Sequence, residues 1–162
     1  MSNIYWKQPV DADFATASDW GGGVVPGAGD AAILNVTRQD YTVSTDENQT
    51  VGSLSLRSNA TLAIAGGVFD AIHGTGSGVN AGEIIVNRGA SVTVTDSLSN
   101  SGNLYVETGG AIVAECSVTG SGQVSFEYGG TMNFTSTLNQ AVTFVGTGDL
   151  LVLETHKVSA GP

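Results

Sequence analysis

Hydrophobic residues in the second half of the chain occur in pairs two positions apart, and each kind of pair returns every twenty residues. A spacing of two points both side chains of a pair to the same face of a β-strand. The first pair is Ile84/Val86, then Leu104/Val106 and Val124/Phe126, and the second is Val92/Val94, then Ile112/Ala114 and Met132/Phe134. The pattern therefore predicts two short strands in each twenty-residue unit.

A third apolar position completes the unit, and it is occupied by Leu98, Val118, Leu138 and Val158. Glycine, asparagine and serine lie between the apolar positions and favour turns. Three short strands at a fixed period indicate one rung of a β-solenoid, with equivalent strands parallel and about 4.8 Å apart. We expect an all-β fold, a single-stranded parallel β-helix. A leucine-rich repeat is excluded because no segment shows the 3.6-residue period of its helix.

The pattern extends in both directions from this region. Upstream, Leu54/Leu56, Leu62/Ile64 and Phe69 are assigned to the same three positions, and Leu34/Val36 with Tyr41/Val43 precede them; downstream, Val142/Phe144 and Leu151/Leu153 form a last rung. On this assignment the interval from Leu54 to Ile84 is thirty, so one rung carries an inserted loop, placed at residues 70–81. We expect about six rungs of roughly 20 residues over residues 31–162.

The ends of such a stack need covering because they expose core and unpaired strand edges. Residues 1–30 do not follow the repeat and contain Trp6, Phe14 and Trp20. We interpret them as an N-terminal cap whose aromatic residues pack on the first rung. At the other end either the last rung is exposed or more protein follows, and we favour an N-terminal piece of a longer protein.

The charge balance limits the partners, with 15 acidic residues against 5 basic ones and a net charge of −10. Nucleic acid is excluded because phosphate contacts need clustered lysine and arginine. The N-terminal residues lack the basic and apolar regions of a signal peptide, and no apolar run is long enough to span a bilayer. Cys116 is the only cysteine, and because it falls outside the regular apolar columns we interpret it as incidental.

The stretch "DFATASDWGGGVVPGAGDAAILN", followed by "YTVSTDENQTVGSLSL" and "ATLAIAGG", resembles the N-terminal part of large bacterial secreted or surface-exposed β-solenoid proteins, similar to autotransporter passengers and haemagglutinin-like adhesins. The resemblance implies secretion or a cell-surface location. Without a leader it implies export through a C-terminal signal or a leader that has been removed. The function we expect is a structural or adhesive module of a larger protein. Its expected partners are surface glycans or proteins, with end-to-end or side-by-side self-association.

Solenoid enzymes place paired carboxylates on adjacent rungs, so catalytic groups would lie at the outward positions of the repeat. The rows are Glu83/Asn103/Gln123, Ile85/Tyr105/Ser125 and Asn87/Glu107/Glu127. Glu107 and Glu127 would be neighbours, but we expect a solvated surface at a strand end and no catalytic site. His73 and His156 are too few for a metal site, and "GAGD" and "GTGD" are interpreted as turns. We expect no enzyme activity and no cofactor.

The inserted loop is the best candidate for recognition, because loops on a rigid scaffold often carry binding residues. Its candidate contact residues are His73, Thr75, Ser77 and Asn80. Two alternative functions stay open at this point. One is a phage fibre or tailspike-like element, which would be trimeric, and the other is a polysaccharide-degrading β-helix enzyme.

Overall fold

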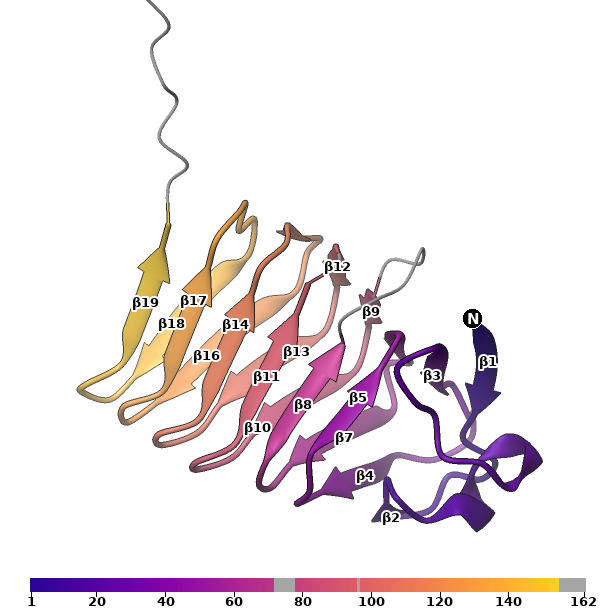
Figure 1. Ribbon diagram of the computed structural model, residues 1–162. Helices are drawn as coiled ribbons and strands as arrows, with labels where there is room; N and C mark the ends of the chain where they lie inside the picture. Colours follow the sequence, from indigo (N-terminus) through magenta and orange to yellow (C-terminus); the bar gives the residue numbers. More distant parts are fainter. Residues whose placement is uncertain (72–77, 96, 155–162) are drawn as a thin grey trace, which may run out of the picture.

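The computed structural model of the protein describes residues 1–71, 78–95 and 97–154. Over these ranges the chain forms three sheets of parallel strands, of six, seven and six strands, around one core (Figure 1). Successive strands pass from one sheet to the next, so that three strands complete one turn of a coil. The structure confirms the predicted β-solenoid of about six turns.

The three sheets are named here in the order in which the chain first reaches them. The first contains β1 (Ser2–Tyr5), β3 (Asp30–Leu34), β6 (Ser53–Leu56), β9 (Gly78–Asn80), β12 (Leu98–Asn100) and β15 (Val118–Thr119). The second contains β2 (Ala12–Asp13), β4 (Tyr41–Thr45), β7 (Ala60–Ile64), β10 (Glu83–Val86), β13 (Asn103–Val106), β16 (Gln123–Glu127) and β18 (Ala141–Val145). The third contains β5 (Gln49–Val51), β8 (Val68–Ala71), β11 (Ser91–Val94), β14 (Ala111–Ala114), β17 (Thr131–Phe134) and β19 (Leu150–Leu153).

The predicted twenty-residue register holds from β10 to β17, and the last turn is shorter, with β18 aligned eighteen residues after β16 and β19 nineteen residues after β17. Ile84 pairs with Leu104 and Leu104 with Val124 in the second sheet. In the third sheet Val92, Ile112 and Met132 are aligned in the same way, and in the first sheet Leu98 aligns with Val118. Inward side chains of these strands are buried and their neighbours are partly exposed, which is the alternation expected of strands with one face on a core.

The assignment of the upstream strands to their faces was wrong. Ile84 aligns with Leu62, not with Leu54, so the interval between these rungs is twenty-two residues. The Leu54/Leu56 pair belongs to β6 in the first sheet, where Leu56 aligns with Leu34 on one side and Asn80 on the other. The reason is that each rung contains several apolar pairs with the same spacing of two, so a pair alone does not say which face it occupies.

The segment assigned to the inserted loop is shorter than residues 70–81. Asp70 and Ala71 belong to β8, and Gly78–Asn80 form β9. Of the predicted loop, the residues between these two strands, 72–77, lie outside the described residues.

Two glycine columns recur every twenty residues for different reasons. Gly82, Gly102 and Gly122 precede strands of the second sheet, at the corner that joins it to the first. There a Cβ on Gly102 would overlap the carbonyl oxygen of Gly82, so the close contact of successive corners requires glycine. Gly89, Gly109 and Gly129 instead have φ of 78°, 69° and 89°, the left-handed conformation that glycine adopts without steric cost.

The first thirty residues form a cap that is continuous with the sheets. β1 pairs with β3, and β2 pairs with β4, so residues on both sides of the predicted boundary at residue 30 share hydrogen-bonded sheets. Two 3-10 turns, Ala17–Asp19 and Gly21–Gly23, flank the buried Trp20. The Trp20 ring meets those of Trp6 and Phe14 edge-on, each with centroids 4.9 Å apart, and its Nε1 donates a 2.6 Å hydrogen bond to the Phe14 carbonyl.

The core runs along the axis from the cap to the last turns, and its largest buried side chains are aromatic or aliphatic. Phe14 of the cap meets Phe69 of β8 edge-on, with centroids 5.4 Å apart, which joins the cap to this core. Cys116 is buried with the core residues, although the sequence placed it outside the apolar columns. It lies in the turn between β14 and β15, where the chain folds its small side chain inward.

Candidate functional site

The outward side chains of β10, β13 and β16 form two rows on the second sheet, polar except for Ile85, and we call this surface the outer face. One row is Glu83, Asn103 and Gln123, and the other is Ile85, Tyr105 and Ser125. The structure therefore brings together the residues that the twenty-residue spacing predicted to be neighbours. Asn103 Nδ2 donates a 2.9 Å hydrogen bond to Glu83 Oε1, and Gln123 Nε2 donates one of 2.9 Å to Ser125 Oγ.

A groove borders the outer face at the corner with the first sheet. Its volume is about 410 Å³, and we call it the corner groove. The side chains that line it are polar, apart from Ala60 and the glycines of the corner: Asp40, Ser58, Asn59, Ala60, Thr61, Gly82, Glu83, Gly102 and Asn103. Because Gly82 and Gly102 have no side chains, the polar groups of three successive turns reach one open space.

Two hydrogen bonds hold Asn59 in place beside this groove. Its Nδ2 donates to the carbonyl oxygens of Val36 and Gln39, at 3.0 and 2.6 Å. On the other side the bond from Asn103 orients the Glu83 carboxylate. Part of the groove is therefore lined by side chains that are already positioned, which lowers the entropic cost of binding a ligand.

Glu107 and Glu127, the predicted neighbouring carboxylates, lie beside Tyr105. The pKa of Tyr105 is raised from 10.0 to about 12, first by the hydrogen bond that its hydroxyl donates to Glu127, then by slight desolvation and by the negative charges of Glu127, Glu107 and Glu83. A phenolate at this position would lose the hydrogen bond and meet three carboxylates. The cluster therefore keeps a neutral tyrosine on the outer face.

We expect Tyr105 to remain protonated above pH 10 in the folded protein. Because its pKa is higher folded than unfolded, its contribution to stability is present below pH 10 and is lost as the pH rises through about 12. The measurement is a tyrosinate absorbance titration of the wild type minus that of Tyr105→Phe, which isolates this group from the other tyrosines. Glu127→Gln should lower the midpoint, and an ordinary midpoint in the wild type would contradict the assigned hydrogen bond.

Asn80, one of the four candidate recognition residues, ends β9 and is fully buried. Its Nδ2 donates to Asn100 Oδ1 at 2.8 Å and to the carbonyl oxygen of Asn103 at 3.0 Å. A side chain in this position is not available to a partner at the surface. His73, Thr75 and Ser77 lie outside the described residues.

The bond between Asn80 and Asn100 belongs to a polar ladder that runs from the interior of the coil to its surface, and the sequence reasoning missed it. Asn100 Nδ2 donates to Gln140 Oε1 at 2.8 Å, and Gln140 Nε2 donates to the Gly120 carbonyl at 3.0 Å. At position 120 the ladder has no side chain, because the residue is glycine and a Cβ there would overlap the Asn100 carbonyl. The sequence carries a signal of this ladder, since positions 80, 100, 120 and 140 are twenty apart, but asparagine and glycine are also the residues typical of turns.

The two glycine-aspartate segments use their carboxylates to hold turns. Asp30 Oδ2 accepts a 3.2 Å bond from the Gly27 N–H, within "GAGD". Asp149 Oδ1, in "GTGD", accepts bonds from the N–H groups of Gly129 and Gly130 at 2.7 and 3.2 Å, which ties its turn to the preceding one. Over the described ranges, no three or more histidine, cysteine or acidic side chains gather in a metal-binding group.

Fold and surface together define the class of the protein as a parallel β-solenoid repeat protein with a polar outer face. No protein-family model, curated protein or solved structure matches the chain significantly. Among the residues that the structure describes, no helix has the length and apolar character needed to cross a membrane.

Proposed function

We propose that this chain is an adhesive module of a larger secreted or cell-surface bacterial protein, and that it binds a surface glycan in the corner groove. The corner groove is the observation that carries the proposal. It is a polar hollow spanning three turns of a rigid coil, with side chains held in place by hydrogen bonds. The sequence resemblance to secreted β-solenoid adhesins supports the location.

The lining of the groove favours a neutral or amino-substituted glycan. Asn59 and Asn103 carry amides, Ser58 and Thr61 carry hydroxyls, and Asp40 and Glu83 carry carboxylates. These groups supply hydrogen-bond donors and acceptors to sugar hydroxyls, and the carboxylates also attract ammonium groups. A chain of net charge −10 repels polyanionic glycans.

The proposal can be tested on an array of neutral, amino and acidic glycans. We expect the wild type to bind neutral or amino glycans, and Asn103→Ala and Glu83→Ala each to weaken binding about tenfold, as for the loss of about 1.4 kcal/mol of hydrogen bonding. Asn133→Ala is the matched control, because Asn133 donates a similar 3.2 Å bond to Glu154 Oε1 on the outside of the third sheet. Absence of neutral and amino ligands, or equal loss in the control, would overturn the proposal.

The same glycans also separate binding from catalysis. We propose that the module binds without cleaving, so the chain length of a bound polysaccharide should stay constant during prolonged incubation. Shortening that disappears in Glu127→Gln or Glu107→Gln would instead establish a polysaccharide-degrading enzyme on the outer face.

A further inference from the structure

A second hollow lies on the same corner of the coil as the corner groove, nearer to the cap, and we call it the cap hollow. Its volume is about 420 Å³, and residues 7–9 and 36–39 line it. The first of these segments connects β1 to β2 and the second connects β3 to β4, so both pass from the first sheet to the second (Figure 1). Asp40, the next residue along the chain, already lines the corner groove, so the two hollows are neighbours.

The cap hollow is lined by cations on a chain that is otherwise acidic. Lys7 and Arg38 are two of the five basic residues, and no acidic residue of the described ranges lines the hollow. Lys7 Nζ donates a 2.7 Å hydrogen bond to the Ser18 carbonyl oxygen, which leaves two of its three N–H donors unused. The Arg38 guanidinium makes no hydrogen bond or ion pair with any described residue, so its five N–H donors are open to a ligand.

The backbone of Arg38 is held in a conformation that favours glycine. Its φ is 106°, and it is one of only two residues other than glycine with a positive φ in the described part of the chain. Hydrogen bonds fix its neighbours, since Asn59 Nδ2 donates to the carbonyl oxygens of Val36 and Gln39. Gln39 Nε2 in turn donates to the Pro9 carbonyl oxygen at 2.6 Å. Strained residues that are held in this way cluster at binding sites.

We propose that the cap hollow binds an oxyanion, namely a carboxylate, sulfate or phosphate substituent of the glycan that occupies the corner groove. Arginine and lysine donate charge-assisted hydrogen bonds to such groups, and the planar guanidinium matches two oxygens of one oxyanion at once. The identity of the ligand rests on the proposed function, whereas the oxyanion site itself does not. Because the net charge of −10 repels polyanions, the ligand is a glycan with isolated anionic groups.

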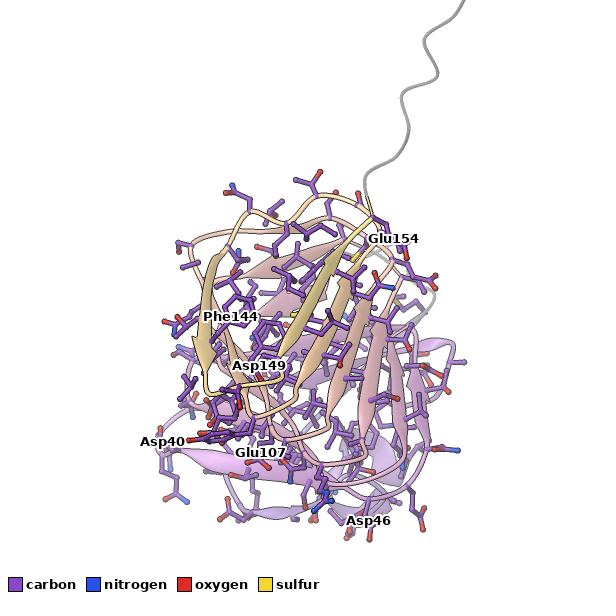
Figure 2. All side chains as sticks on the ribbon, turned by 90° about the vertical axis from the view of Figure 1, so that its left-hand side faces the viewer. Asp40, Asp46, Glu107, Phe144, Asp149 and Glu154 are labelled. Atoms are coloured by element: carbon purple, nitrogen blue, oxygen red, sulfur yellow. The ribbon has the colours of Figure 1, made fainter. Side chains whose placement is uncertain are left out.

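The order of the charges along the corner defines this glycan further. Lys7 and Arg38 lie at the cap, and Asp40 and Glu83 follow in the corner groove. Figure 2, the view onto the end of the coil at β19, shows Asp40 at the outer edge of the coil. Only β7 separates β4, which follows Asp40, from β10, which begins with Glu83, so these two strands lie about 10 Å apart. The matching glycan carries an oxyanion on one sugar and an ammonium group on a nearby sugar.

Inorganic sulfate tests the cap hollow without the glycan. Sulfate titrated into the full chain, at an ionic strength kept constant with chloride, should shift the NMR signals of the Lys7 and Arg38 backbone amides until they saturate. Arg38→Gln should weaken sulfate binding at least tenfold. Arg88→Gln is the control, because it removes the same charge from an exposed arginine at another corner, between β10 and β11. Absence of saturable shifts, or equal weakening in both variants, would overturn the oxyanion site.

A matched pair of oligosaccharides tests whether the oxyanion belongs to the same glycan. The probes are a chito-oligosaccharide with free amino groups and the same oligosaccharide with a few carboxymethyl groups. The carboxymethylated probe should bind the wild type about tenfold more tightly, and Arg38→Gln should remove this advantage. Equal affinities in the wild type, including no binding of either probe, or an advantage that persists in Arg38→Gln, would overturn the shared ligand.

The proposed function and the cap hollow fail separately in this design. Glu83→Ala should weaken binding of the unmodified oligosaccharide, whereas Arg38→Gln should leave it unchanged. Loss of the first effect counts against the corner groove, and the sulfate titration decides on the cap hollow alone.

Arg38→Gly separates a binding role of this residue from a structural one. Relief of the strain at φ 106° offsets the greater freedom of glycine in the unfolded chain, so we expect no loss of stability in urea unfolding. The same variant should lose sulfate binding. A variant that is less stable but still binds sulfate would show that the arginine serves the turn, which would contradict the proposal.

Discussion

Gly102→Ala is expected to destabilise the protein by about 3 kcal/mol or more, because it forces overpacking between two backbone segments. The added Cβ would overlap the Gly82 carbonyl oxygen and lie 2.7 Å from the carbonyl carbon of Ala81. These are backbone atoms of the preceding corner, so relief requires two turns of the coil to separate. Equilibrium unfolding in urea, with circular dichroism as the signal, measures the loss.

Gly29→Ala is the matched control for this substitution. A Cβ at Gly29 meets nothing within 4 Å, and this residue is not among those with positive φ. Its stability should change by no more than about 0.5 kcal/mol. Similar losses in both variants would show that glycine at position 102 serves no special contact between corners.

Trp20→Ala is expected to cost about 3–5 kcal/mol, the range for removing a large buried aromatic side chain. Trp20 is fully buried, meets Trp6 and Phe14 edge-on, and donates its indole N–H to the Phe14 carbonyl. Removal would open the core beneath the cap. Thermal and urea unfolding of the variant measure the effect.

Tyr5→Ala tests whether the effect of Trp20 comes from burial. Tyr5 is an aromatic residue of the same region, in β1, but its side chain is exposed. We expect a loss of about 1 kcal/mol or less for this variant, in line with its small buried area. If it destabilised the protein as much as Trp20→Ala, the cap would not act by covering the core.

The periodic part of the fold was predictable because the strand pattern within each unit and the interval between units are both regular there. Ile84, Leu104 and Val124 repeat a strand pattern at a constant interval, and constant intervals allow parallel strands to stack in register. The prediction failed upstream, where Leu62 lies twenty-two residues before Ile84 and the register depends on how the turn closes. The last turn is irregular too, since Val142 lies eighteen residues after Val124, but its two apolar pairs align with those of the preceding turn as predicted.

The candidate site likewise has one part that the repeat predicts and one part that it does not. The rows of the outer face follow from the repeat, and the structure aligns Glu83 with Asn103 as predicted. The corner groove was not predicted, because it needs the correct alignment of Thr61 with Glu83 and the space left by the corner glycines. Asn80 was misplaced at the surface because an asparagine in a stretch rich in glycine and small residues has the local pattern of a loop, and only the stacked partner Asn100 identifies it as a core residue.

The corner groove, and with it the proposed function, depends on the register that places β7 beside β10. The most direct test is disulfide formation between cysteines introduced in place of outward residues, in a Cys116→Ala background. Paired residues of adjacent parallel strands lie within the range that a disulfide can bridge. Ala63→Cys with Ile85→Cys should form the bond, because these residues are aligned. Bonding instead between Ser55→Cys and Ile85→Cys, the alignment first inferred from the apolar pairs, would contradict the account.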